Sequence, residues 1–353
     1  MLLGWYITKF ATSYPSFNDD RNPFLSAMLP IAFQTPCLLK AMLAVAGTQA
    51  SREQPDLLPV TLQCRIGAIR GLRTNLSTET PEAWGVRDII GRLACSMTLF
   101  IYEKIECEER ALRSHLSYAA SLVARLLACS PVIDDDTRFL IQLFLHNDIY
   151  AAFALRQPPT LDCIPEAALS HVLQSNTFPR MMASVARLAS TGPSMDMPED
   201  VWQLSSSLTL WRPSMNWLPS ASRRRQTTAM ETAAQVHQCA AITSLDRSLG
   251  LQPDNSAARS SLDSIYTIPD SDSITASLLW PTVVLGAEIT DLDQRRRLQG
   301  RLHMLGLKTG FKQYFKALQL LEDCWEASGK NGAATVSWID VMHDTGNILL
   351  CAL

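Results

Sequence analysis

The chain has 353 residues, of which 47% are hydrophobic and 18% charged, and its formal net charge is −3. This composition supplies a large hydrophobic core and excludes a disordered protein. The small net charge excludes a global attraction to nucleic acid or to an anionic membrane, and the local basic clusters Arg223–Arg225 and Arg295–Arg297 are expected to be solvated.

Membrane and secretion signals are not found. No apolar run reaches the roughly 18 residues that a membrane helix needs, and the first ten residues lack the basic region and cleavage site of a signal peptide. The nine cysteines are scattered singly, without the C-x2-C pairs of zinc sites or disulfide scaffolds. We therefore expect an intracellular chain whose cysteines are small buried side chains in a reducing compartment.

Helix signals begin near residue 22. Asn22 followed by Pro23, and Thr35 followed by Pro36, each place an N-cap residue before a proline at the first helical position. The second of these helices is predicted to end at Gly47, because glycine commonly ends helices.

The middle and the end of the chain show the periodicity of buried helices. Residues 134–155 begin with acids and are then apolar nearly all round, which indicates a central helix. Two further segments carry one apolar stripe each, made of Leu112, Leu116, Ala119, Leu122, Val123 and Leu126 in the first, and of Phe311, Phe315, Leu318, Leu321 and Trp325 in the second.

Strand signals are weak, since no two alternating segments are joined by a hairpin turn. Loops are predicted near 190–198, 213–222 and 250–257, but the composition does not shift at them. The sequence therefore predicts a single large all-α domain over residues 1–353, built of packed helical hairpins and without a significant sheet.

Two acidic stretches resemble in part the motifs of class I terpene cyclases, which bind magnesium through aspartates at helical spacing. Asp134–Asp136 has Arg138 where the last acid of the motif belongs, and the stretch that begins at Asp148 has Ala151 and Leu155 in place of serine and glutamate. We interpret Asp134–Asp136 as a helix N-cap and the region of Asp148 as a buried polar patch.

Other catalytic patterns also fail. The six histidines show no H-E-x-x-H motif and no pair at i, i+4, and His115 and His146 are expected to be structural residues on buried faces. The stretch SGKNG resembles a phosphate-binding loop only in part, with Cys324 and Asn331 at two required positions. No catalytic, cofactor-binding or metal-binding residue is predicted, so we do not expect an enzyme.

The stretch 278–298, LLWPTVVLGAEITDLDQRRRL, combines an apolar run with an acid and three arginines. Trp280 and Pro281 suit a helix start, and Gly286 indicates the close approach of another backbone. Glu288 lies two helical turns before Arg295. An acid at a helix interface is most simply a structural partner for an arginine or for a buried backbone amide.

This stretch resembles the W-P-x4-G-x-E-x-T…R signature of the fungal-specific transcription factor domain. Four further blocks agree in the same order: residues 22–47, residues 115–122 with Tyr118 in place of a glycine, residues 144–153 around Asp148, and residues 317–325 with 338–350. The resemblance spans essentially the whole chain and implies an all-α regulatory region, with Trp280 as a core anchor and Glu288 as a hydrogen-bonded interior acid.

The resemblance implies a nuclear transcriptional regulator, with a fungal metabolic gene cluster (secondary metabolism) as its target. Implied partners are the transcription machinery, a DNA-binding factor or a second copy, together with a small hydrophobic effector whose pocket cannot be placed on residues. Members of this family read DNA through a separate zinc-cluster module with six close cysteines, which is missing here. We therefore expect no specific DNA binding by this chain alone, and no cofactor. The alternative is a lipophilic-ligand binding module or an unassigned enzyme on an all-α scaffold.

Overall fold

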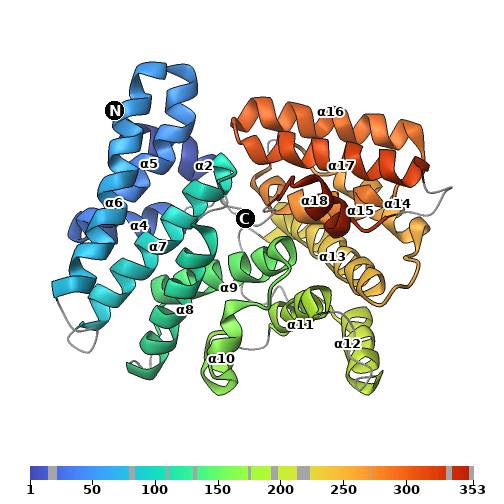
Figure 1. The fold of residues 1–353 in the computed structure, drawn as a ribbon, viewed down its shortest axis with the longest axis horizontal. Coiled ribbons are helices and arrows are strands. Elements are labelled where there is room, and N and C mark those ends of the chain that lie inside the picture. The colour runs from blue at the N-terminus through green and yellow to red at the C-terminus, as the bar shows by residue number, and fades with distance from the viewer. Residues whose placement is uncertain are drawn as a thin grey trace. The chain divides into compact units, whose positions relative to one another are not determined.

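The computed structural model describes residues 1–14, 22–78, 84–108, 111–129, 133–173, 176–191, 198–212, 223–270, 272–330 and 336–349. Over these residues every regular element is a helix (Figure 1), which confirms the predicted all-α class without a sheet. No helix within these ranges combines the length and the apolar character that a membrane crossing requires.

The chain divides into two compact units. Unit 1 comprises Met1–Asp148, Thr160–Gln174 and Thr309–Lys312, and unit 2 comprises Ile149–Pro159, Ser175–Lys308 and Gln313–Leu353. The long helix α9 (Asp135–Leu155) begins in unit 1 and ends in unit 2. That residues 1–353 act together as a single domain stays a prediction.

Unit 1 is built from short N-terminal helices followed by long ones. Apart from the start of α9, its helices are α1 (Leu2–Trp5), the π-helix η1 (Tyr6–Phe10), α2 (Ala11–Ser13), α3 (Pro23–Ser26), α4 (Met28–Gln34), α5 (Pro36–Glu53), η2 (Pro55–Leu57), α6 (Leu58–Thr78), α7 (Val86–Glu106), α8 (Leu112–Cys129), η4 (Thr160–Cys163) and α10 (Glu166–Leu173).

The predicted helix starts near residue 22 are largely confirmed. The Asn22 side chain accepts a hydrogen bond from the backbone N–H of Phe24 at 3.0 Å, as an N-cap does. Residues 23–34 nevertheless form two helices, with a break at Ala27. Thr35 occupies the N-cap position of α5, but its side chain makes no capping hydrogen bond.

Gly47 does not end α5, and this part of the sequence prediction is wrong. The helix continues to Glu53, and Gly47 lies where α5 packs against α6. A Cβ added at Gly47 would meet the Thr61 hydroxyl oxygen of α6 at 2.1 Å. The glycine is therefore required by the close approach of two helices rather than by a turn.

The apolar stripe of α8 is confirmed, because all six predicted residues are buried. The second predicted stripe is confirmed only in part. Phe311, Leu321 and Trp325 are buried, but Leu318 is half-buried and Phe315 is 37% exposed. Phe315 packs over Gly306 of α16, where an added Cβ would lie 2.6 Å from the Phe315 ring. Phe315 therefore lies at the interface of two helices and not in the core.

Unit 2 contains the end of α9 and the C-terminal helices. These are α11 (Phe178–Thr191), α12 (Pro198–Leu210), α13 (Arg223–Ser248), α14 (Asn255–Ile265), the 3-10 helix η5 (Ser273–Leu278), α15 (Leu279–Ala287), α16 (Leu292–Thr309), α17 (Lys312–Lys330) and α18 (Trp338–Thr345).

The predicted loops are partly helical. Helix α11 runs to Thr191 and α12 begins at Pro198, so only 192–197 remain of the first loop, and these lie outside the described residues, as does all of 213–222. The third loop is shorter than predicted, because α14 begins at Asn255. Asp254 caps it by accepting hydrogen bonds from the backbone N–H groups of Ser256 and Ala257.

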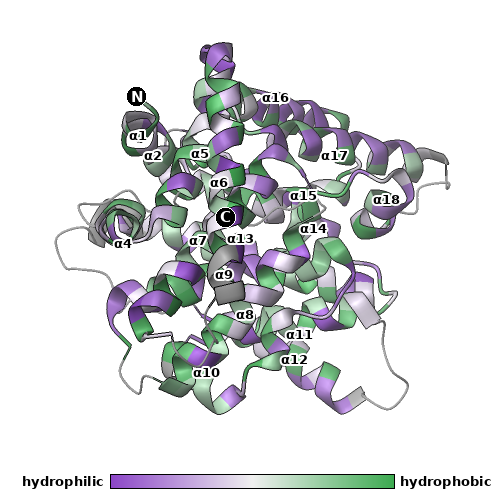
Figure 2. Cartoon of the chain, turned by 60° about the vertical axis from the view of Figure 1, so that its left-hand side comes forward, coloured by the Kyte–Doolittle hydropathy of each residue, from purple (hydrophilic) through white to green (hydrophobic). Residues whose placement is uncertain are grey.

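Helix α13 is the central element of unit 2, since it packs against α11, α12, α14, α15 and η5. Every residue of α15, from Leu279 to Ala287, is buried. Helices α16 and α17 lie side by side (Figures 1 and 2), joined by a hydrogen bond of 2.7 Å from Gln299 to Glu322. Much of α16 is coloured as hydrophilic in Figure 2, in keeping with its exposed face.

Two glycine substitutions test the close packing of α5 and α6. Gly47→Ala is expected to destabilise the protein by about 1–3 kcal/mol, because the added methyl group overlaps the β-branched Thr61 side chain. Gly300→Ala is the matched control, since Gly300 is exposed within α16 and a Cβ there meets nothing within 4 Å. It should stabilise by about 0.5–1 kcal/mol through helix propensity alone. Urea denaturation of both variants is the measurement, and equal effects of the two would contradict the packing.

Candidate functional site

Glu288 lies at the C-terminal end of α15 and forms a buried ion pair with Arg247 in the last turn of α13. The two hydrogen bonds run from Arg247 Nε to Glu288 Oε1 at 2.9 Å and from Arg247 Nη2 to Glu288 Oε2 at 2.5 Å. The Glu288 side chain is 1% exposed. The predicted interior acid with an arginine partner is confirmed, and this parallel two-bond geometry is the strongest that the two groups can form.

The arginine partner is not the nearby Arg295 of α16. Arg295 Nε donates instead to the carbonyl oxygen of Ile289 at 2.8 Å, and its guanidinium lies over the Trp325 ring at 5.1 Å. Burial lowers the pKa of Arg295. The expectation of a solvated 295–297 cluster is therefore wrong for Arg295, whereas Arg296 and Arg297 are exposed. The side chains of Arg223–Arg225 lie outside the described residues.

Trp280 is the predicted core anchor, and the structure confirms this role. Its exposed fraction is 1%, and its ring lies 5.0 Å from that of Tyr150, 5.5 Å from Phe153 and 6.0 Å from His237. The Tyr150 hydroxyl and His237 Nδ1 are 3.1 Å apart. Burial lowers the pKa of His237 to about 4, so the imidazole is neutral near pH 7 and belongs to the core.

Gly286 allows the close approach that the sequence predicts, although the approaching groups are side chains and not a backbone. A Cβ at Gly286 would meet Leu298 of α16 at 2.7 Å and Leu321 of α17 at 3.1 Å. Trp325 Nε1 donates to the Gly286 carbonyl oxygen at 2.9 Å. The stretch 278–298 therefore joins α13, α15, α16 and α17 and carries no exposed reactive group at Glu288.

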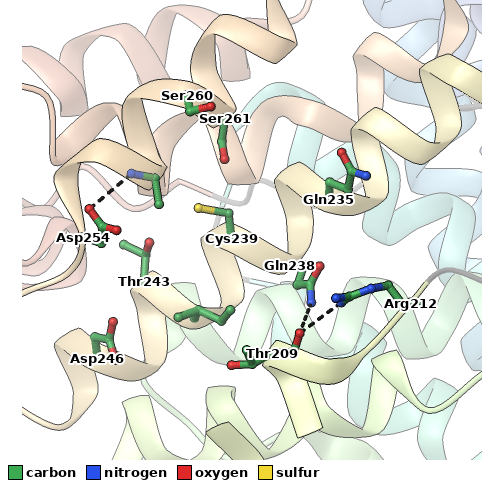
Figure 3. Close-up of a pocket in the computed structure, with 12 residues that line it drawn as sticks. Thr209, Arg212, Gln235, Gln238, Cys239, Thr243, Asp246, Asp254, Ser260 and Ser261 are labelled. Atoms are coloured by element: carbon green, nitrogen blue, oxygen red, sulfur yellow. Dashed lines mark hydrogen bonds between the residues drawn. The ribbon is translucent and has the colours of Figure 1, made fainter. Parts of the chain in front are cut away.

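A pocket of about 470 Å³ lies beside α13, bounded by α12 and α14 (Figure 3). Sequence reasoning missed it, because its residues come from three separate helices. Most of its lining residues have polar side chains, although their apolar atoms make up much of the exposed wall; the residues are Thr209, Arg212, Gln235, Gln238, Cys239, Ile242, Thr243, Asp246, Asp254, Ala257, Ser260 and Ser261.

Some of the lining groups stabilise the walls of this pocket. Gln238 Nε2 donates to the carbonyl oxygens of Leu208 at 2.5 Å and Trp211 at 3.1 Å, which fixes the end of α12 on α13. Arg212 Nη1 donates to the carbonyl oxygen of Thr209 at 3.1 Å. Figure 3 draws the Arg212 contact and a further hydrogen bond from Gln238 Nε2 to the Thr209 carbonyl oxygen at 3.3 Å. This wall is held by side-chain to backbone hydrogen bonds.

Cys239 lies near the middle of the pocket, between Ser261 above and Thr243 below in Figure 3. Its thiol hydrogen-bonds with both hydroxyls, but burial is the larger effect and raises the pKa of Cys239. The described lining residues include no histidine or lysine that would act as a base toward this thiol. The thiol is therefore protonated near pH 7 and is not an activated nucleophile.

The carboxylates of the pocket differ in their surroundings. Burial raises the pKa of Asp246, whereas hydrogen bonds from Ser256 and Ala257 lower the pKa of Asp254. Together with Arg212, these residues place two carboxyl groups and one guanidinium around the hydroxyl and amide groups of the pocket. These groups can hydrogen-bond with a ligand, and the apolar atoms between them add van der Waals contacts.

The remaining sequence candidates have structural roles. Asp134 Oδ1 accepts a hydrogen bond from the backbone N–H of Thr137 at 2.7 Å, which confirms the predicted N-cap of α9. Arg138, at the position where a metal motif needs an acid, forms an ion pair with Asp135 at 2.7 Å. Asp148 is buried and accepts hydrogen bonds from Thr160 and Leu161, as predicted for a polar patch.

The histidines 115 and 146 are half-buried rather than fully buried. Burial lowers the pKa of His115 to about 4, and the adjacent charge of Arg65 acts in the same direction. Within the part of the chain that the structure describes, no three His, Cys, Asp or Glu side chains are grouped to hold a metal ion.

A family model described as the fungal specific transcription factor domain matches residues 1–163 and 181–351. The match covers nearly the whole chain, including the 278–298 stretch and the residues of the pocket. Comparisons with curated proteins and with solved structures gave no match.

The chemistry of the pocket is tested by alkylation of Cys239. Because burial raises its pKa, Cys239 is expected to react with iodoacetamide at pH 7.5 more slowly than the exposed Cys129 and Cys163. Peptide mass spectrometry after timed quenching gives the three rates. A faster reaction at Cys239 would mean that an activated thiol lines the pocket, which contradicts the assignment above.

Proposed function

The chain belongs to the fungal specific transcription factor domain family, and we propose that it regulates transcription through contacts with other proteins in the nucleus. The observation that carries the proposal is the extent of the family match, which spans nearly all of the chain. We also propose that these 353 residues do not themselves bind a specific DNA sequence. The nine separated cysteines support this, because a zinc-cluster module needs closely spaced cysteines.

A face of α6 is suited to a protein partner. Leu58, Leu62 and Ile66 recur at i, i+4 and i+8, and they are 50%, 39% and 47% exposed. Residues at this spacing form one stripe along a helix, and an apolar stripe on an exposed helix is a common contact for another helix. We propose that this stripe binds a protein of the transcription machinery, a DNA-binding factor or a second copy.

A tethered reporter tests this function. The chain is fused to an unrelated bacterial DNA-binding module, and expression of a reporter with the matching operator is measured in a fungal host. The wild-type fusion is expected to change reporter expression at least several-fold relative to the module alone. The double variant Leu62→Glu and Ile66→Glu should lose most of this effect, because two charges on the stripe prevent an apolar contact.

The control variant is Gln63→Glu, which adds a charge to an exposed position of α6 beside the stripe. It should keep the wild-type effect. Surface substitutions of this kind change stability by roughly 0.5 kcal/mol or less, and immunoblotting confirms equal protein levels. A fusion without any effect on the reporter would contradict the regulatory function, and full activity of the double variant would contradict the role of α6.

Experiments on the purified chain test whether it binds a specific DNA sequence. We expect no stoichiometric zinc by elemental analysis and no sequence-specific duplex binding. Any residual binding should fall steeply with salt, because only counterion release drives it. Two zinc ions per chain would refute this part of the proposal.

The finer parts of the proposal concern the target genes and the effector. A fungal metabolic gene cluster is the proposed target, and transcript profiling of a deletion strain is its test. A small hydrophobic effector is also part of the proposal.

A further inference from the structure

Two thiols meet where the first turn of α5 packs against α6 and α7. The side chains of Cys37 on α5 and Cys95 on α7 are neighbours that affect each other's ionisation. A Cβ at Gly71 of α6 would lie 2.7 Å from the Cys37 Cβ, and one at Gly91 of α7 would lie 2.6 Å from the Thr35 hydroxyl oxygen. These glycines let α5 approach closely, and the register that places Thr35 on Gly91 brings Cys37 to Cys95, one turn further along α7.

The two thiols have different surroundings. Cys37 is half-buried at the second position of α5, where its sulfur accepts a hydrogen bond from the backbone N–H of Leu38. The Cys95 thiol, the Leu38 N–H and the charge of Arg92 lower the pKa of Cys37 to about 7. Cys95 is buried, and burial raises its pKa. Near pH 7 the pair therefore contains a reactive thiolate beside a protonated thiol.

The positive charge beside the pair is fixed in place. Arg92 is one turn before Cys95 on α7 and is 5% exposed, and its guanidinium lies over the Trp84 ring at 3.9 Å. The Tyr118 side chain of α8 lies beside it. A buried guanidinium held against an aromatic ring stabilises a thiolate more than a solvated arginine does, because water screens it less.

We propose that Cys37 and Cys95 form a hydroperoxide-responsive dithiol that is oxidised to an intramolecular disulfide joining α5 and α7. An accessible low-pKa cysteine next to a second thiol is the arrangement that such oxidation requires. This site is separate from the proposed contact stripe on α6, and its chemistry can be tested whether or not the chain regulates transcription.

The reaction takes two steps. The Cys37 thiolate attacks one peroxide oxygen, the O–O bond breaks, and the leaving alkoxide or hydroxide takes up a proton from water, which leaves Cys37 as a sulfenic acid. The Cys95 sulfur then attacks the Cys37 sulfur, the S–O bond breaks, and hydroxide leaves with the proton of Cys95 as water. Two thiols are oxidised by two electrons in total, and one hydroperoxide is reduced to an alcohol and water. A dithiol reductant reverses the cross-link by exchange.

The test uses the purified full chain, reduced and then treated with equimolar hydrogen peroxide at pH 7. Digestion under non-reducing conditions followed by mass spectrometry should yield a peptide in which Cys37 is joined to Cys95, two hydrogens lighter than the reduced pair and absent after dithiothreitol. Cys129→Ser with Cys163→Ser is the control, since both are exposed cysteines outside the pair. It should form the same cross-link at the same rate.

A second variant separates the two steps. In Cys95→Ser the sulfenic acid of Cys37 cannot be resolved, while the serine hydroxyl keeps a hydrogen-bond donor beside Cys37, so labelling of Cys37 by dimedone is expected to increase at least several-fold over the wild type. Far-UV circular dichroism verifies that the variant is helical, and the wild-type measurement stands by itself if it is not. A folded wild type that forms no peptide joining Cys37 to Cys95 would overturn the proposal. So would equal dimedone labelling of Cys37 in a folded Cys95→Ser variant and in the wild type.

Discussion

The buried ion pair of Arg247 and Glu288 is the constraint on which the packing of unit 2 depends. Glu288 lies at the C-terminal end of α15, where the helix dipole disfavours a negative charge. Removing an ionised carboxylate from water costs several kcal/mol unless a charged partner with good geometry is present. Arg247 supplies that partner through two hydrogen bonds, and its own charge is favoured in the last turn of α13. The pair therefore fixes where α15 ends against α13.

Two sets of contacts follow from this position. The end of α15 presents the Gly286 carbonyl oxygen to Trp325 and the bare Gly286 backbone to Leu298 and Leu321, which positions α16 and α17. Helix α13 also carries Asp246, the residue before Arg247, which lines the pocket between α12 and α14. A scaffold of this kind places the pocket on well-packed helices of unit 2, and the proposed contact stripe lies on α6 of unit 1. It agrees with a regulatory domain that works by binding, and it leaves the oxidation of Cys37 as the one covalent reaction that we assign to the described residues.

Local signals in the sequence were enough to predict local structure. Asn22 and Asp134 cap helices as predicted, because a side chain and a backbone N–H two or three residues away decide a cap. The burial of Trp280 and Glu288 could also be predicted, since both lie in an apolar run. The partners of these residues could not be predicted. The sequence indicates a helix end at Gly47 because nothing local shows that Thr61 packs on it, and Arg247 lies 41 residues before Glu288. Cys37 and Cys95 read as isolated cysteines for the same reason, because helical periodicity gives the face that a helix buries and not the helix that covers it.

A double-mutant cycle on the ion pair tests the central claim most directly. Glu288→Leu, Arg247→Met and the double variant are compared with the wild type by urea denaturation. Each single variant leaves one charge without its partner and is expected to lose about 3–5 kcal/mol of unfolding free energy. The double variant should lose less than the sum of the two losses by about 1–3 kcal/mol, because the residues in contact are coupled. Additive losses, with a coupling energy near zero, would show that the packing of unit 2 does not depend on this pair.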